Sequence, residues 1–128
     1  MRSGDTFLYP LDPPNTAHLW IVLTNPDSDG LVLIVNVTTT YSLDKERVDT
    51  TVSLNPGEHP FVRKPSYLYY RGAMSKKVSD LESEAKAGRL KMHTPCSQAL
   101  LGLARAGVGA SRHCSRATKR FYDERKGL

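Results

Sequence analysis

The sequence predicts an α+β fold, in which a small, partly closed antiparallel β-barrel is followed by C-terminal helices. Five or six short strand-like segments follow one another up to residue 72, with no room between them for crossover helices. Beyond residue 72 the apolar residues recur at helical spacing. The length of 128 residues is about that of one domain, so we expect a single domain (1–128) with a barrel part (1–72) and a helical, basic part (73–128).

The first three predicted strands carry most of the apolar residues of the barrel part. The first covers about residues 5–9 and leads into a proline-rich loop, because proline fixes φ and lacks an amide donor. The second, 18–23, is apolar on both alternating faces, as in strands that are covered on both sides. A turn at 25–30 separates it from the third, 31–38, whose many β-branched residues make it the clearest strand.

The remaining strands of the barrel part are shorter. Residues 39–50 are polar and predict a surface loop, and a weak strand follows at 51–54. A tight turn at Asn-Pro-Gly-Glu then precedes a short extended segment at 59–64. Proline interrupts that segment, and an aromatic strand covers 66–70.

The helical part begins after residue 72. Ser75 is expected to cap the first helix, which should end at Gly88. Thr94, followed by proline at a first helical position, predicts the start of the next helix. Three glycines are expected to weaken or break that helix: Gly102, Gly107 and Gly109. Beyond them one apolar helical stripe is predicted at Ala110, Cys114, Ala117 and Phe121.

The net charge of +5 is unevenly distributed along the chain. Residues 1–99 hold 11 basic and 11 acidic side chains, whereas residues 100–128 hold 7 basic and 2 acidic ones. A basic segment attracts polyanions and is consistent with nucleic-acid binding, but a solvated helix face or a dock for an acidic peptide fits equally well. The expected RNA-binding residues of this basic helix are Arg112, Arg116, Lys119 and Arg120.

Several classes of protein are disfavoured by the sequence. The longest strongly apolar run, 31–35, is too short to span a membrane, and the N-terminus has no signal-peptide pattern, so we expect a cytoplasmic protein. The two cysteines, Cys96 and Cys114, do not suggest a disulfide framework or a zinc site. No nucleotide-binding or metal motif is present, so no cofactor and no metal are expected.

Two histidines lie at the edges of predicted elements, where proton-transfer chemistry could occur. Cleavage of RNA without metal needs a base, an acid and cations that stabilise the phosphorane. His18 and His59 could supply the first two roles, and Arg63 or Lys64 the third. Alternatively, each histidine is a loop residue that hydrogen-bonds the backbone.

Further polar residues lie near these candidates. Asn36 and Thr38 point to one face at the end of the third strand, and Thr38 is expected to position a phosphate. Ser66 and Tyr67 add hydroxyl groups after the two cations, and a tyrosine can stack on a base. The alternatives are plain solvent exposure for the strand-end residues and plain packing for the tyrosine.

Several short motifs together resemble PemK/MazF-type toxins. They are Gly4-Asp5, Leu11-Asp12-Pro13, the strand Leu19–Thr24 before Asn25, the strand Leu31–Thr38, and Ser66-Tyr67-Leu68. The resemblance implies an SH3-like barrel with helices, usually a homodimer, that cleaves single-stranded RNA and is blocked by a short antitoxin with an acidic tail. It also implies that Thr38 is the family's strand-end threonine. His18 stands where the family has an arginine, and the segment around His59 is foreign to its pattern.

The leading expectation is therefore a metal-independent endoribonuclease of a toxin–antitoxin pair. A non-catalytic module of the same fold, which binds nucleic acid or an acidic partner, is the alternative. A third possibility is a toxin that grips a protein target rather than RNA.

Overall fold

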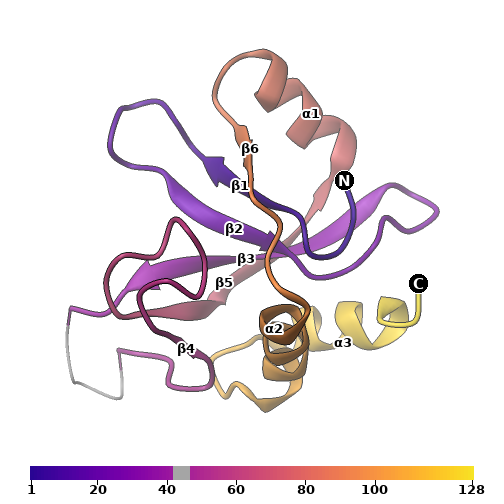
Figure 1. The fold of residues 1–128 in the computed structure, drawn as a ribbon. Helices are drawn as coiled ribbons and strands as arrows, with labels where there is room; N and C mark the ends of the chain where they lie inside the picture. The colour runs from indigo at the N-terminus through magenta and orange to yellow at the C-terminus, as the bar shows by residue number, and fades with distance from the viewer. Residues whose placement is uncertain (42–46) are drawn as a thin grey trace.

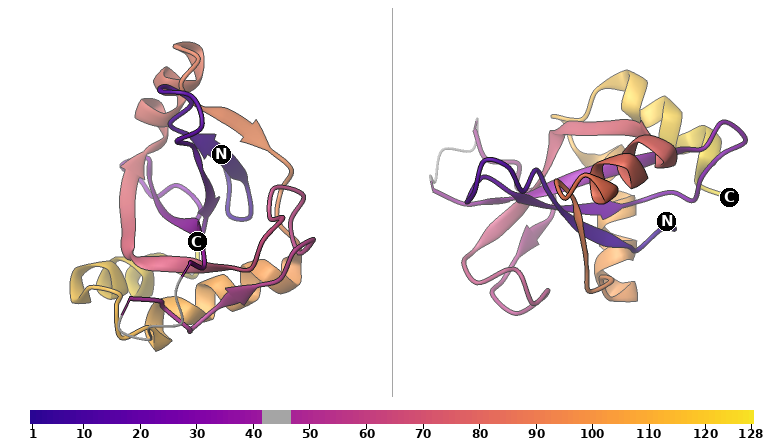
Figure 2. Two further views of the ribbon diagram at one scale, coloured as in Figure 1. Left: turned by 90° about the vertical axis from the view of Figure 1, so that its left-hand side faces the viewer. Right: turned by 90° about the horizontal axis from the view of Figure 1, so that it is seen from above.

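The computed structural model describes residues 1–41 and 47–128 and has an α+β fold (Figure 1). The elements, in chain order, are β1 (Thr6–Tyr9), β2 (His18–Val22), β3 (Leu31–Thr39), β4 (Ser53–Leu54), β5 (Ser66–Lys77), α1 (Val78–Lys86), β6 (Lys91–His93), α2 (Gln98–Ala110) and α3 (Arg116–Arg125). The strands of the described residues form one antiparallel sheet in the order β4-β5-β3-β2-β1-β6. This sheet curls into a half-barrel (Figure 2).

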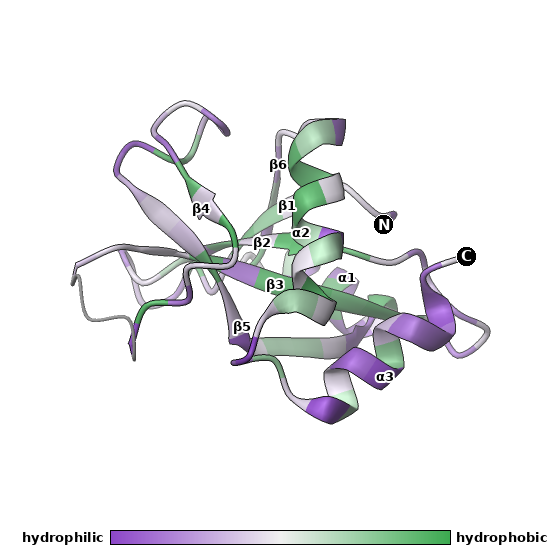
Figure 3. Cartoon of the chain, turned by 90° about the horizontal axis from the view of Figure 1, so that it is seen from below, coloured by the Kyte–Doolittle hydropathy of each residue, from purple (hydrophilic) through white to green (hydrophobic). Residues whose placement is uncertain are grey.

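Both faces of the central strand β3 are covered. On one face Leu33, Val35 and Val37 belong to the main core, which also contains Leu100 and Ala104 of α2. On the other face, apolar residues of β3 join a smaller core that is closed by α1, and its buried members are Phe7, Val22, Val32, Ile34, Leu81 and Leu90. This double coverage explains why the sequence of β3 is apolar without alternation. In Figure 3, β3 and α2 are largely green, and α3 is mostly purple.

The sequence-predicted strands at 5–9, 18–23, 31–38 and 66–70 are confirmed in β1, β2, β3 and β5. The weak strand at 51–54 is reduced to β4, and the predicted loop at 39–50 lies partly outside the described residues. The prediction of an extended segment at 59–64 is wrong. These residues belong to a loop that is closed by a hydrogen bond from Gly57 N to Val62 O (2.9 Å).

The boundary between sheet and helices does not lie at residue 72. Strand β5 continues to Lys77 because its second half pairs with β3 from Leu31 to Ile34, so Ser75 is a strand residue and not a helix cap. Strand β6, which the sequence analysis missed, pairs with β1 and covers an edge that would otherwise expose unpaired backbone groups. Gly88 follows the end of α1 with a φ of +78°, as predicted.

Helix α2 differs from prediction at its start and along its length. Its N-cap is Ser97, whose hydroxyl accepts a hydrogen bond from Leu100 N (3.1 Å), and not Thr94. The glycines do not break the helix. A Cβ on Gly107 would lie 2.0 Å from the hydroxyl oxygen of Tyr70, which donates to Ala104 O at 2.8 Å. The predicted apolar stripe is also interrupted, because Cys114 lies in the turn between α2 and α3.

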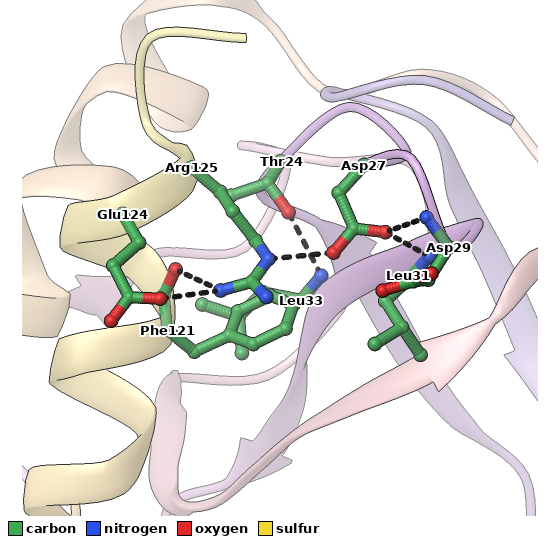
Figure 4. A network of polar contacts seen from close by, with 8 residues as sticks. All are labelled: Thr24, Asp27, Asp29, Leu31, Leu33, Phe121, Glu124 and Arg125. Carbon is green, nitrogen blue, oxygen red and sulfur yellow. Dashed lines mark hydrogen bonds and ion pairs between the residues drawn. The ribbon is translucent and has the colours of Figure 1, made fainter.

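Helix α3 is fastened to the β2–β3 turn by a polar network (Figure 4). Arg125 Nε donates to Asp27 Oδ2 at 2.7 Å, and its guanidinium lies 3.7 Å from the ring centroid of Phe121. The other carboxylate oxygen of Asp27 accepts from the backbone amides of Asp29 and Leu31, both at 2.9 Å. Asp27 thus both shapes the turn and holds the last helix, and the contact with Arg125 lowers its pKa. Within the described residues, no helix combines the length and apolar character needed to cross a membrane.

We expect Gly107→Ala to lower the free energy of unfolding by about 3 kcal/mol, because the methyl group displaces Tyr70 and breaks its buried hydrogen bond. Urea denaturation measures the change. Gly102→Ala in the same helix is the matched control, since nothing lies within 4 Å of its Cβ, and it should raise stability by about 0.5–1 kcal/mol. Equal effects of the two variants would contradict the Tyr70 contact.

We also expect Asp27→Asn to lower the melting temperature at neutral pH. The folded protein holds the pKa of Asp27 below its ordinary value of 3.8, so the stabilisation is present above that pH and is lost as the pH falls through the lowered pKa. The melting temperatures of wild type and variant should therefore converge in strong acid. Asp123→Asn is the control, because its pair with Lys126 is long (3.6 Å) and exposed, and it should change little at any pH.

Candidate nucleic-acid groove

Two adjoining hollows, of about 450 Å³ and 250 Å³, lie where the β1–β2 loop, the end of β3 and the loop before β5 meet. They share four residues, namely Val37, Thr39, Tyr41 and Phe61, and so form one continuous depression, which we call the basic groove. The larger hollow adds Asn15, Thr16, Ala17, His18 and Thr38. The smaller hollow adds Val62, Arg63, Lys64 and Ser66.

The sheet brings His18 and Thr38 into the larger hollow together. Strands β2 and β3 are antiparallel neighbours with Leu19 opposite Val37, so one step further along the ladder His18 comes opposite Thr38. His18 is exposed, and its ring has no hydrogen-bond partner among the described residues. His18 and Thr38 thus line the same hollow, although they lie far apart in the chain.

Asn36 orients Thr38 from below the groove surface. It is buried, with 6% of its surface exposed, and its side-chain amide donates to Thr38 Oγ1 at 3.0 Å. Because this bond uses a lone pair of the hydroxyl, the hydroxyl proton remains to donate, and no acceptor for it lies among the described residues. Asn36 itself does not line the groove, so it positions Thr38 and does not contact a ligand there.

The charge of the groove is positive. Arg63 and Lys64 are exposed on the smaller hollow, and neither forms an ion pair with the described residues. No aspartate or glutamate is among the described residues that line either hollow. Among the described residues, the charge of these two groove cations is thus not cancelled by a carboxylate that lines the groove, so the groove suits an anionic ligand.

Two exposed aromatic side chains line both hollows, and the sequence analysis did not select either of them. Tyr41 is 86% exposed and Phe61 is 39% exposed. In the sequence, Tyr41 is a lone aromatic residue in a polar segment, and Phe61 lies next to His59 and close to Arg63 and Lys64. These features could have marked both residues as candidate stacking surfaces. Flat rings beside free cations can bind a base by stacking while the cations bind its phosphate.

The expected pairing of His59 with His18 in a common hollow is wrong. His59 is 2% exposed and lines neither hollow. Its Nδ1 accepts a hydrogen bond from Phe61 N (3.0 Å), and its Nε2 donates to Thr94 O (2.7 Å). Burial lowers the pKa of His59. The ring is thus a buried, neutral, hydrogen-bonded group and is not placed to exchange protons with a ligand in the groove.

Ser66 and Tyr67 differ in their relation to the groove. Ser66 lines the smaller hollow, but its hydroxyl donates to Lys64 O at 2.8 Å and so supports the turn that carries the cations. Tyr67 is 7% exposed, lies opposite Thr38 on β3 and lines neither hollow. Burial raises the pKa of Tyr67. Stacking of a base on Tyr67 is therefore not supported by its position.

The predicted basic helix residues are not part of the groove. Arg116, Lys119 and Arg120 belong to α3, which lies at the opposite end of the molecule from the β1–β2 loop (Figures 1 and 2). Lys119 Nζ donates to Gly109 O at 3.2 Å, at the end of α2. Arg112 lines a separate hollow beside His113 and Asp49. The structure thus separates the two basic regions that the sequence analysis combined.

A metal site is not evident either. Within residues 1–41 and 47–128, no group of three or more His, Cys, Asp or Glu side chains could hold a metal ion. Cys96 and Cys114 are both buried free thiols, and burial raises the pKa of each.

Comparison of the chain with protein-family models, with curated proteins and with solved structures finds no match. The resemblance to PemK/MazF-type toxins thus stays a prediction.

Proposed function

We propose that the protein binds single-stranded RNA in the basic groove. The observation that carries this proposal is the combination, in one depression, of two exposed aromatic rings with two cations that form no ion pair with the described residues. Cationic grooves with aromatic stacking surfaces are the usual solution for binding single strands, because the cations follow the backbone and the rings stack on unpaired bases. In a duplex the base faces are stacked on one another and cannot reach such rings.

Hydroxyl groups at the end of β3 support RNA in particular. Thr38 lines the larger hollow and has a hydroxyl proton to donate, and Thr39 lines both hollows. A ribose 2′-hydroxyl accepts and donates hydrogen bonds, and this group distinguishes RNA from DNA. The proposed arrangement therefore places the backbone along Arg63 and Lys64 and a ribose near Thr38.

Cleavage of the bound strand is a second candidate function, and the position of His18 favours it. This exposed imidazole, which has no hydrogen-bond partner among the described residues, lines the larger hollow together with Thr38. As a general base, His18 would take the proton of a 2′-hydroxyl, whose oxygen attacks the adjacent phosphorus. The 5′-oxygen would leave with a proton from Lys64 or water, giving a 2′,3′-cyclic phosphate and a 5′-hydroxyl, while Arg63 would stabilise the phosphorane charge.

The remaining expectations of the family resemblance belong to this second candidate. They are an SH3-like identity for the curled sheet, a homodimer, and a short acidic antitoxin. The positive groove supports the last of these, because an acidic peptide and an RNA backbone would compete for the same two cations, Arg63 and Lys64.

We expect the double variant Arg63→Gln, Lys64→Gln to bind single-stranded RNA more weakly and with a smaller dependence on salt. The slope of log affinity against log salt should fall by about 0.7 for each lost phosphate contact. Tyr41→Ser should cost about 1–3 kcal/mol through lost stacking, with the slope unchanged. Fluorescence anisotropy of a labelled single-stranded RNA over a salt series measures both quantities.

The matched control for the groove cations is the double variant Arg116→Gln, Arg120→Gln in α3, which should bind like wild type. If instead the α3 variant reduces the salt slope and the groove variant does not, RNA binds at the basic helix and the proposal is wrong.

For cleavage, we expect purified protein to degrade single-stranded RNA in the presence of EDTA. His18→Gln should reduce the rate by about 100-fold or more, the usual contribution of a general base. His113→Gln, which replaces a histidine outside the groove, should leave the rate unchanged. Gel electrophoresis of the RNA after incubation measures the cleavage. If the RNA is recovered intact from the wild-type protein, cleavage is refuted and the proposed function is binding alone.

A further inference from the structure

The loop that carries Phe61, Arg63 and Lys64 is anchored at His59. From Asn55 to Arg63, the backbone hydrogen bonds join residues of the segment to one another, as from Gly57 N to Val62 O and from Val62 N to His59 O, both at 2.9 Å. Among the described residues, the side chain of His59 alone connects residues 55–63 by hydrogen bonds to another part of the protein, and at the end of the loop Ser66 Oγ donates to Lys64 O at 2.8 Å. Val62 adds apolar packing against the main core.

The anchor has one defined protonation state. Nδ1 of His59 faces the amide proton of Phe61 and must therefore accept, so the ring proton is on Nε2 and is donated to Thr94 O at 2.7 Å. Thr6 Oγ1 donates to the same carbonyl at 2.6 Å. The neutral imidazole thus joins the backbone of Phe61, on the groove wall, to the segment that follows β6.

We propose that His59 is the positioning residue of the basic groove and that its protonation releases the groove wall, so that RNA binding weakens in mild acid. This inference rests on the proposed RNA binding. A second proton would have to sit on Nδ1, where it would meet the Phe61 N–H, and the bond that fixes Phe61 would be lost. Phe61 would then lose its hydrogen bond and keep the edge contact of its ring with His93, whose ring centroid lies 6.2 Å away.

The surroundings of His59 disfavour the protonated, positively charged form of its ring. Among the described residues, the titratable group that faces it is His93 of β6, with ring centroids 5.0 Å apart, and β1 presents only the uncharged Thr6. Burial is the main cause that lowers the pKa of His59 from 6.5, and His93 adds to it, whereas the bond to Thr94 O acts in the opposite direction. A released, solvated ring would bind a proton below about pH 6.5, so the anchored state loses stability as the pH falls below that value.

Simple electrostatics predicts the opposite pH dependence. Acidification makes the net charge of any protein more positive, and this would strengthen the binding of an anion. A loss of RNA affinity on acidification therefore separates release of the anchor from this general gain of positive charge.

The test is the affinity for a fluorescently labelled polyuridine oligonucleotide between about pH 8 and about pH 5.5. Wild type should bind about tenfold more weakly at the acid end, the effect of losing one stacking ring. His59→Gln cannot take up a proton, so its affinity, whatever its value at pH 8, should not fall further in acid. His113→Gln is the matched control and should retain the acid loss. Wild-type affinity that stays constant or rises on acidification would overturn the proposal.

A measurement without RNA keeps the inference separate from the proposed function. Nitrogen NMR of the histidine rings should show His59 neutral with its proton on Nε2 at pH 7, and the Phe61 amide signal should shift together with His59 on titration. A proton on Nδ1, or a Phe61 amide that does not respond when His59 titrates, would refute the anchor even if RNA binds. If no RNA binds at pH 8 while these signals behave as expected, the proposed function fails and the anchor remains.

Discussion

The burial of β3 on both of its faces is the constraint on which the rest of the structure depends. One face needs α2 and the main core, and the other needs α1 and the smaller core, so the helices of the C-terminal part are required to cover a strand near the N-terminus. Burial ends only at Thr38 and Thr39, where the strand reaches the surface. The groove lies at this point because there the polar end of the central strand emerges between two loops.

Two histidines illustrate how position decides the role of a residue type. His18 and His59 both stand at the edges of elements, next to prolines or turns, and the sequence offers no means of ranking them. In the structure His18 is exposed in the groove, whereas His59 is buried and joins Phe61 N to Thr94 O through its two ring nitrogens. An exposed imidazole is free to exchange protons, but a buried one with both nitrogens bonded is a structural group.

The arginines and lysines divide in a similar way. Arg125 is bonded to Asp27 and packed on Phe121, and Arg105 donates to the hydroxyl of Tyr122 at 3.2 Å and to Lys126 O. These side chains fasten the last helix, so the excess of charge at the C-terminal end is partly structural. Arg63 and Lys64 have no such partner within the described residues. The groove is therefore a better candidate than the C-terminal helix for binding an anionic ligand.

The sequence by itself determined the α+β class and the places of β1, β2 and β3, because these follow from neighbouring residues. Continuous apolar segments and β-branched runs indicated these strands, and the polar end of β3 pointed to Thr38. Only the tertiary structure decided the length of β5, the existence of β6, the interior place of His59 and the stacking surface of Tyr41 and Phe61. Each of these depends on a partner remote in the chain, such as Thr94, 35 residues beyond His59. The sequence around a residue does not show such remote partners. Burial and strand pairing depend on which segments the folded chain brings together, and not on the residue type alone.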